Sequence, residues 1–181
     1  MIYLRPFEAD DYKLINKWRN DKELHKLTGG IYFYISGESD RNWVAEKMKF
    51  SVKELYVAIC LKDTNEMIGY TSLNEIDSIH RKCVWGGIVI GGEAGKGKNV
   101  GFQTGLLILG YAFNSLNMNR VLGTYFESNV KSARLTAKLG FKVEGIVRNS
   151  LFKHGKYHNE VYVGLLREEF EEVVNSLKQE S

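Results

Sequence analysis

The chain has 181 residues, with 25 Lys and Arg against 22 Asp and Glu, and a net charge of +3. Its 44% hydrophobic and 26% charged content excludes an intrinsically disordered chain, and its length suits a single domain with a sizeable core. The longest nearly apolar run, Gly105–Phe113, is far shorter than the ~20 residues of a membrane-spanning helix, so we expect no membrane association.

The pattern of apolar, polar and turn-forming residues predicts strands and helices in mixed order. The predicted strands are Ile2–Arg5, which Pro6 ends, then Leu55–Leu61, Met67–Leu73, Cys83–Ile90, Arg120–Phe126, Phe141–Phe152 and His158–Leu166. The predicted helices are Glu8–Asn20, Asp40–Phe50, Phe102–Leu116, a helix that Asn129 begins and Gly140 ends, and Glu168–Leu177, with Thr28–Asp40 as a loop. One strand–helix–strand unit stands at the centre of this order, which implies an α/β sandwich with a mixed sheet rather than a doubly wound fold.

The spacing of the cysteines and histidines argues against a metal or redox site, and the distribution of charge favours an anionic ligand. Cys60 and Cys83 have neither metal-ligand nor redox spacing, and the histidines are not spaced as metal ligands. The first residues, MIYLRPFEADD, lack the apolar stretch of a secretory signal, so we expect a cytoplasmic protein. Residues 167–181 carry two basic and five acidic side chains, a net charge of −3, so residues 1–166 carry +6. This basic excess favours an anionic ligand but is too small to indicate a nucleic-acid surface.

Residues 85–113, WGGIVIGGEAGKGKNVGFQTGLLILGYAF, are predicted to form a strand, a glycine-rich loop and a helix. Glycines let backbone N–H groups approach a ligand closely, and the start of a helix adds unpaired N–H groups and the positive end of a dipole. This combination is typical of phosphate sites. Lys96 and Lys98 add positive charge at the rim.

Three interpretations of the loop stay open on these grounds. The stretch Gly92–Asn99 comes within one residue of the P-loop pattern G-x-x-x-x-G-K-[ST], but Asn99 stands where a hydroxyl would hold Mg²⁺, and no apolar strand ends in an Asp for the metal. A glycine-rich turn that binds nothing is the second interpretation. The third is a loop that holds a pyrophosphate with N–H groups and a helix dipole, without Mg²⁺.

The loop and its helix resemble the acetyl-CoA loop of the GNAT N-acetyltransferases. In the family pattern Q/R-x-x-G-x-G/A, Lys96 takes the first place, Asn99 the first glycine and Gly101 the second. Asn is the residue other than glycine that best tolerates a left-handed backbone, so this departure is small. Similarity to the RimJ/RimL-type branch covers nearly the whole chain and rests on Leu4-Arg-Pro, Trp18-Arg-Asn-Asp21, Tyr111-Ala-Phe, Asn119-Arg-Val121, Asn129-x-x-Ser132, Lys138-Leu-Gly-Phe141 and Gly155-Lys-Tyr-His158.

The resemblance implies a GNAT-like fold, a mixed and mostly antiparallel sheet of about seven strands flanked by helices, with a V-shaped split between the fourth and fifth strands, 83–90 and 120–126. It also implies one acetyl-CoA-binding N-acetyltransferase domain over residues 1–181, with acetyl-CoA as co-substrate and no metal. The residues that it assigns to the cofactor are Ile88, Val89 and Ile90 beside the pantetheine arm, Lys96, Gly97, Lys98, Asn99, Val100, Gly101 and Phe102 at the pyrophosphate, and Asn129 and Ser132.

The implied reaction is direct attack of an amine on the thioester, with a backbone N–H near Ile88–Ile90 stabilising the oxyanion and CoA leaving as a thiolate. Many members place a Tyr where this chain has Thr136, so Ser132 is the candidate proton donor, although it is equally the N3 residue of a capped helix. Glu75 and Glu127, near the ends of the third and fifth predicted strands, are candidate bases that act through a water or attract a cation.

The acceptor stays open among a protein N-terminus, a polyamine, an amino sugar and an aminoglycoside-like drug. A lysine-like amine, with a pKa of ~10.4, asks more of a base than an α-amine at ~7.8. Candidate walls of the acceptor pocket are Tyr32, Phe33, Tyr34 and Tyr157.

The alternative is a GNAT-like protein that binds CoA without catalysis, because Thr136 replaces the usual Tyr. We expect a small-molecule or peptide amine as the partner and no nucleic acid. A homodimer is compatible with the resemblance.

Overall fold

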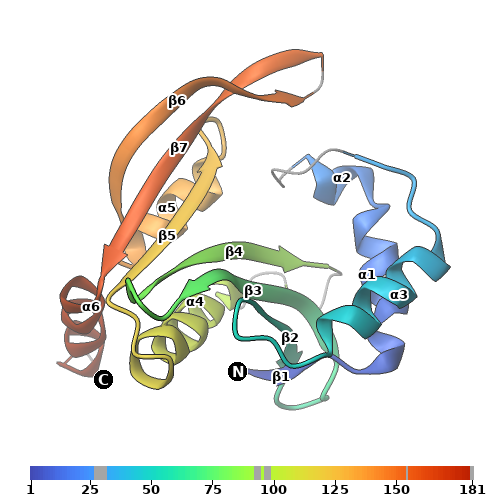
Figure 1. Ribbon diagram of the computed structural model, residues 1–181, viewed down its shortest axis with the longest axis horizontal. Coiled ribbons are helices and arrows are strands. Elements are labelled where there is room, and N and C mark those ends of the chain that lie inside the picture. Colours follow the sequence, from blue (N-terminus) through green and yellow to red (C-terminus); the bar gives the residue numbers. More distant parts are fainter. Residues whose placement is uncertain (27–31, 92–94, 96–98, 154, 180–181) are drawn as a thin grey trace.

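The computed structural model describes residues 1–26, 32–91, 95, 99–153 and 155–179 (Figure 1). They form a seven-stranded sheet with the strand order β1-β2-β3-β4-β5-β7-β6. The strands are β1 (Ile2–Pro6), β2 (Leu55–Leu61), β3 (Met67–Asp77), β4 (Lys82–Ile90), β5 (Arg120–Phe126), β6 (Lys142–Lys153) and β7 (Lys156–Leu166). The helical elements are the 3₁₀ turn η1 (Ala9–Asp11), α1 (Tyr12–Arg19), α2 (Lys22–His25), α3 (Gly37–Lys47), α4 (Val100–Gly110), the π-helical turn η3 (Tyr111–Ser115), α5 (Val130–Lys138) and α6 (Arg167–Gln179).

The parallel pair of β4 and β5 divides the sheet. The other neighbouring strands are antiparallel, whereas β4 and β5 run parallel and pair only over Lys82–Val84 and Arg120–Leu122. Beyond these residues β4 continues to Ile90 and β5 continues to Phe126, but the two strands no longer pair with each other. They diverge in Figure 1. The predicted fold class, a mixed and mostly antiparallel sheet with a V-shaped split between its fourth and fifth strands, is confirmed.

Helices cover the two halves of the sheet differently. In β2, Ala58 packs against α1 and α3 on one face, and Val57 packs with α4 on the other. In the half formed by β5, β7 and β6, Val163 is buried on the face that carries α4, α5 and α6, whereas Tyr162 on the opposite face is 44% exposed. One face of the β5–β7–β6 half is therefore open to solvent.

Several predicted strands have other ends in the structure, and two of them show why. Pro6 does not stop β1 before itself but is its last paired residue, opposite Val57, since an edge strand tolerates a missing N–H. β3 runs to Asp77 rather than to Leu73, because it continues through an irregular pairing with β4 in which Glu75 has a φ of +51°. The predicted strand Arg120–Phe126 matches β5 at both ends.

The helices between β1 and β2 also differ from the prediction. α2 is a short helix inside a stretch for which no separate element is predicted, and Asp21 begins it by accepting the N–H groups of Glu23 and Leu24. α3 begins at Gly37 rather than at Asp40, so the predicted loop Thr28–Asp40 is shorter. The cause is a local cap, because the Ser36 hydroxyl accepts the N–H of Ser39 at 3.1 Å.

The helices around the split lie close to one another. α4 begins earlier than predicted, at Val100, and passes into η3. A Cβ on Gly105 would come within 2.4 Å of the Leu139 Cδ1, so the approach of α4 to the end of α5 requires glycine there. α5 has the predicted caps, because the Asn129 Oδ1 accepts the Ser132 N–H at 3.1 Å and Gly140 follows with a φ of +91°. Among the described helices, none is both long enough and apolar enough to cross a membrane.

Two glycines of α4 offer a matched test of this packing. Gly105→Ala is expected to lower the free energy of unfolding by about 1–3 kcal/mol, because its methyl group overlaps the buried Leu139 side chain. Gly110→Ala is expected to raise it by up to about 1 kcal/mol, because a methyl group there meets nothing within 4 Å and helix propensity improves. Urea midpoints at unchanged m-value measure both effects. Equal stability of the two variants would contradict the close approach of α4 and α5.

Candidate functional site

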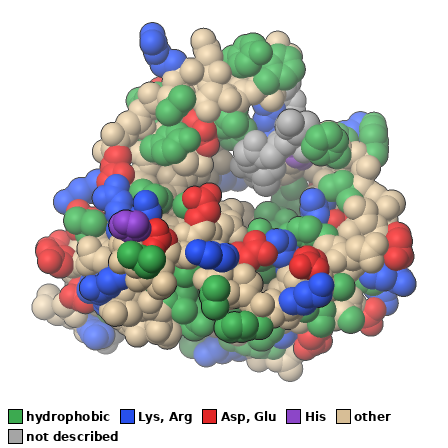
Figure 2. All heavy atoms as spheres, in the orientation of Figure 1, with side chains coloured by type: hydrophobic (Ala, Val, Ile, Leu, Met, Phe, Trp, Pro, Cys, Tyr) green, Lys and Arg blue, Asp and Glu red, His purple; other side chains and the backbone are tan. Residues whose placement is uncertain are grey.

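The split between β4 and β5 holds a cleft of about 370 Å³. Its walls are the two diverging strands, the start of α5 and the hairpin of β6 and β7, and the surface is hollowed between this hairpin and the half of the molecule that carries α1–α3 (Figure 2). The residues that line the cleft are Val84, Trp85, Gly86, Gly87, Ile88 and Val89 of β4, Thr124, Tyr125 and Phe126 of β5, Asn129 and Ser132 at the start of α5, and Leu151 and Glu160 of the hairpin.

A β-bulge bends β4 just past its last residue paired with β5. Opposite Ser72, β4 has one residue more than β3, and the glycines Gly86 and Gly87 lie there. Gly87 has a φ of +85°, and a Cβ on Gly86 would lie 2.2 Å from the Ser72 Oγ. The Thr71 hydroxyl donates to the Gly87 carbonyl at 2.6 Å and accepts from the Trp85 Nε1 at 2.9 Å. A buried chain of hydrogen bonds therefore fixes the bulge.

Beyond the bulge, the outer edge of β4 faces the split with unpaired backbone groups. The Gly91 N–H donates to the Ile68 carbonyl of β3 at 2.9 Å. Because alternate residues of an antiparallel strand point to opposite neighbours, Val89 also directs its backbone groups toward β3, and Ile88 and Ile90 direct theirs toward the split. Of the three residues predicted to lie beside the pantetheine arm, Ile88 and Ile90 thus direct their backbone groups toward a ligand in the split. Val89 lines the wall of the cleft but directs its backbone groups toward β3.

The start of α4 has the geometry of an anion site. Asn99 is its N-cap and has a left-handed backbone, with φ 53° and ψ 29°, as predicted for an Asn in the place of a glycine. The Asn99 carbonyl accepts the Gln103 N–H at 3.1 Å, and the N–H groups of the first turn, Val100, Gly101 and Phe102, have no intrahelical acceptor. The predicted residues Lys96, Gly97 and Lys98 lie outside the described residues.

The start of α5 brings two further predicted residues to the cleft, Asn129 and Ser132. The Asn129 side chain caps the helix, and the Ser132 hydroxyl forms no hydrogen bond with the described residues. One turn later, the Thr136 hydroxyl donates to the carbonyls of Ser132 and Ala133, at 2.9 and 3.1 Å. The Thr136 hydroxyl therefore donates its hydrogen bonds within the helix, and Thr136 does not line the cleft.

The acidic residues of the site are placed differently from the prediction. Glu75 is exposed in the irregular part of β3, and Glu127 is exposed after β5, where its Oε2 accepts the Asn159 Nδ2 at 2.8 Å. Neither lines the cleft. The carboxylate that does is Glu160 of β7, which the sequence analysis missed. The alternation of buried Val161 and Val163 along this strand is a signal that Glu160 faces the other side, but only the strand order places it beside the split.

The aromatic residues predicted as pocket walls do not line the cleft. Phe33, Tyr34 and Tyr157 are 61%, 86% and 64% exposed, and the Tyr32 hydroxyl donates to the Asn20 carbonyl at 3.1 Å. Nearby, the tip of the β6–β7 hairpin contacts α2 through the buried Lys153, whose ammonium donates to the His25 carbonyl. Burial lowers the pKa of Lys153.

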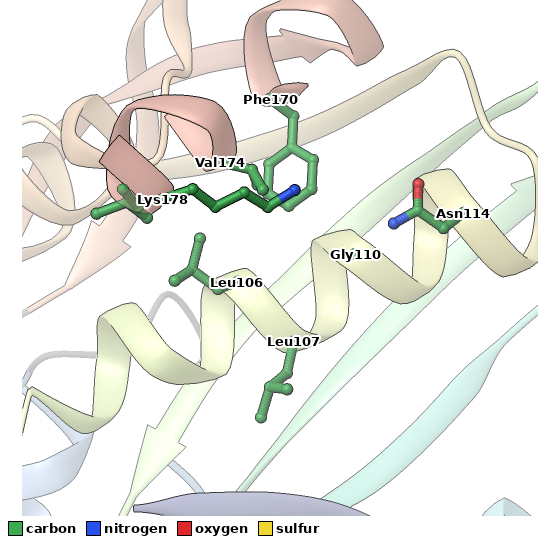
Figure 3. Close-up of a pocket in the computed structure, with 8 residues that line it drawn as sticks. Leu106, Leu107, Gly110, Asn114, Phe170, Val174 and Lys178 are labelled. Atoms are coloured by element: carbon green, nitrogen blue, oxygen red, sulfur yellow. The ribbon is translucent and has the colours of Figure 1, made fainter. Parts of the chain in front are cut away.

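A larger cavity of about 530 Å³ lies away from the split, between α4 and α6 (Figure 3). Its walls are mostly apolar, and none of the described residues that line it is acidic. The lining residues are Leu106, Leu107, Gly110, Asn114, Phe170, Val174, Leu177 and Lys178. Elsewhere, the described residues contain no group of three or more His, Cys, Asp or Glu side chains that could hold a metal ion.

The left-handed backbone at Asn99 can be tested by stability. Asn99→Val is expected to lower the free energy of unfolding by about 1–2 kcal/mol, because a β-branched side chain is disfavoured in this conformation. Asn99→Gly is the control and is expected to stay within about 0.5 kcal/mol of the natural chain, because glycine adopts the conformation freely. Denaturant unfolding distinguishes the two variants, and an equally stable Asn99→Val variant would contradict the assigned backbone.

Comparison with known proteins agrees with this geometry. Residues 2–142 match the family model of the acetyltransferase (GNAT) domain. An uncharacterized N-acetyltransferase derived from the SPbeta prophage of Bacillus subtilis is 27% identical over 94% of this chain and 92% of its own length. Spermidine N(1)-acetyltransferase of Escherichia coli is 24% identical over 93% and 88%. The crystal structure of spermidine N-acetyltransferase from Vibrio cholerae, in complex with CoA and spermine, superposes with a TM-score of 0.85 at 21% identity, over 94% of this chain and 98% of that one.

The sheet split beside a parallel strand pair and the matching family model together define a protein of the acetyltransferase class. The chain belongs to the GNAT acetyltransferase family. It is an N-acetyltransferase, an enzyme that acetylates amines.

Proposed function

We propose that this enzyme transfers the acetyl group of acetyl-CoA to a primary amine by direct attack, and that residues 1–181 are one domain with this activity. The observation that carries the proposal is the open edge of β4. Ile88 lines a cleft that ends near the start of α5, and Ile90, which lies beyond the cleft wall, directs its backbone groups to the same side of β4. A pantetheine arm, which carries amide groups of its own, can pair with such an edge as an added strand does.

The pyrophosphate of CoA suits the start of α4. The N–H groups of Val100, Gly101 and Phe102 have no intrahelical acceptor, and the helix dipole favours an anion there. We assign Asn99 to the same group and also include the predicted Lys96, Gly97 and Lys98. These residues fit a pyrophosphate held without a metal, and Asn129 lies in the cleft wall where the arm would pass.

The unpaired N–H groups beyond the bulge are the candidates for stabilising the oxyanion that forms when an amine attacks the thioester. The hydrogen bonds that fix Gly87 hold this backbone in place before the reaction, which is how such donors stabilise a transition state. Ser132 is proposed to give a proton to the departing CoA sulfur, since its hydroxyl lies in the cleft. Glu75 and Glu127 stay predictions as bases, and each would need water to reach the cleft.

The proposed acceptor is a small amine of the polyamine kind. Support comes from the spermidine acetyltransferases among the relatives and from a carboxylate, Glu160, in the cleft wall. A protein N-terminus is the second candidate. It is favoured by a putative ribosomal N-acetyltransferase of Bacillus subtilis, 31% identical over 58% of this chain and 56% of that protein. The homodimer and the cytoplasmic location stay predictions.

Cofactor binding is tested by thermal unfolding with acetyl-CoA, with CoA and with Mg-ATP. A ligand at 100 times its Kd adds about 2.7 kcal/mol of stability, which for a chain of this size raises Tm by about 5–10 °C. Acetyl-CoA and CoA are expected to give this shift, and Mg-ATP none. Release of CoA thiol with a panel of spermidine, a peptide with a free N-terminus and an amino sugar then measures turnover. The protein's own thiols are buried, and burial raises the pKa of Cys83 to about 11, so they do not react in this assay. No shift with either CoA compound, or no turnover with any amine, contradicts the proposed function.

Two hydroxyls one turn apart on α5 test the proton donor. Ser132→Ala is expected to lower kcat about 10–100-fold with little change in the Kd of acetyl-CoA, because the thiolate loses its proton source. Thr136→Ala is the control and is expected to stay within about two-fold, because its hydroxyl is bonded within the helix. Equal activity of both variants would leave Ser132 as no more than part of the helix cap.

A further inference from the structure

Glu160 reaches the cleft from the face of the sheet opposite to α4 and α5. Along β7, Val161, Val163 and Leu165 are buried with those helices, so Glu160 points the other way. Its register partner on β5 is Phe126, at the end of the strand that forms one wall of the split. Ser132 of α5 lines the same cleft. The cleft is thus lined by a hydroxyl from the face of α4 and α5 and by a carboxylate from the open face.

The hairpin is bent so that this carboxylate has a neutral neighbour. β6 has more residues than β7 between the pairs Val147–Glu160 and Leu151–His158, and the Asn149 N–H in this bulge donates to the Asn159 Oδ1 at 3.0 Å. The bulge brings Ser150 to Glu160, and the Ser150 hydroxyl donates to the Glu160 Oε2 at 2.9 Å.

Within the described part of the chain, Glu160 has no ion pair and is the only acidic side chain that lines the cleft. A half-buried carboxylate that no described cation pairs with is free to form a charge-assisted hydrogen bond with a cationic ligand. On the neighbouring strands, the titratable and charged groups within a few residues of Glu160 or of its register partners are His158 and Tyr162 of β7, Tyr125 and Glu127 at the end of β5, and Glu144, Arg148 and Lys153 of β6.

We propose that Glu160 is a catalytic residue that binds the acceptor amine in its ammonium form and removes one proton from it, directly or through one water. This inference rests on the proposed function. The proton moves to a Glu160 oxygen and leaves a lone pair on nitrogen. That pair forms the new C–N bond at the thioester carbon, and the C–S bond breaks with its electrons on sulfur. Ser132 gives its proton to the CoA thiolate, and the second proton of the attacking nitrogen replaces it on the Ser132 hydroxyl, so the amide and CoA thiol are the products.

The proposal also defines a class of acceptor. A cationic amine meets a carboxylate in the cleft, whereas an acceptor with an acidic group next to its amine meets repulsion there. Among amines of similar size, di- and polyamines are therefore expected to have higher kcat/KM than amino acids.

The test is Glu160→Gln, which keeps the shape and removes the charge, assayed with spermidine and with an amine of low pKa from pH 6 to 10. Spermidine kcat/KM at pH 7 is expected to fall about 100–1000-fold. The loss is expected to shrink as the pH rises toward the pKa of the amine, because the amine then arrives without its proton. The Kd of acetyl-CoA is expected to stay unchanged. Glu144→Gln is the matched control, since Glu144 lies on the same hairpin, pairs with Arg120 and does not line the cleft.

Ser150→Ala is the second variant and leaves Glu160 in place. In the pH profile of kcat/KM for this variant, the acidic limb is expected to move to higher pH, because the ionised carboxylate has lost a hydrogen bond. If the Glu160→Gln variant does not fold, the shift of the acidic limb in Ser150→Ala tests the role of Glu160 by itself. A Glu160→Gln variant as active as Glu144→Gln, or an unmoved limb in Ser150→Ala, overturns the role of Glu160 while acetyl transfer by the natural chain stands. No turnover of any amine by the natural chain overturns both the role and the proposed function.

Discussion

The site depends on one constraint, the short parallel pairing of β4 and β5. A longer pairing would close the sheet, and no edge would be left for a ligand in its middle. The bulge at Gly86 and Gly87 prevents this by bending β4 just after Val84, its last paired residue. The hydrogen bonds from Trp85 to Thr71 and from Thr71 to Gly87 tie the bend to the buried Thr71 and Trp85 side chains, so the position of the split is set by the core.

The parallel pairing of β4 and β5 also makes the two faces of the sheet different. A parallel pair needs a long connection, and here α4 and η3 provide it, so the start of α4 comes directly after the free edge of β4. On the other face of the β5–β7–β6 half, Tyr162 is exposed and α2 contacts the tip of the hairpin, so a second molecule can approach the split from that side between these points.

Much of this arrangement could be predicted from the sequence. Asn99 is left-handed because its residue type tolerates the conformation, and Asn129 and Gly140 cap α5 because of their own chemistry. Features of this kind follow from the residue type alone and need no knowledge of the tertiary structure. The start of α3 was misplaced because Ser36 caps a turn without apolar residues. Glu160 was missed for a different reason. Its side of the sheet follows from the alternation along β7, but its distance from the split follows from β7 lying between β5 and β6, which a linear pattern does not contain.

The placement of a hydroxyl and a carboxylate in the cleft agrees with the demands of the two ends of the reaction. A thiol has a pKa of ~8.5, so a thiolate at pH 7 lies only about 2 kcal/mol above its protonated form. A polyamine nitrogen with a pKa of ~10.4 lies about 4.6 kcal/mol from the neutral form that attacks. The larger demand is therefore at the amine, where a base is needed, and the smaller one is at the sulfur, where a weak acid suffices. A threonine at position 136 is tolerable on this argument, because the proposed role of Ser132 is at the end that needs less help and the proposed role of Glu160 is at the end that needs more.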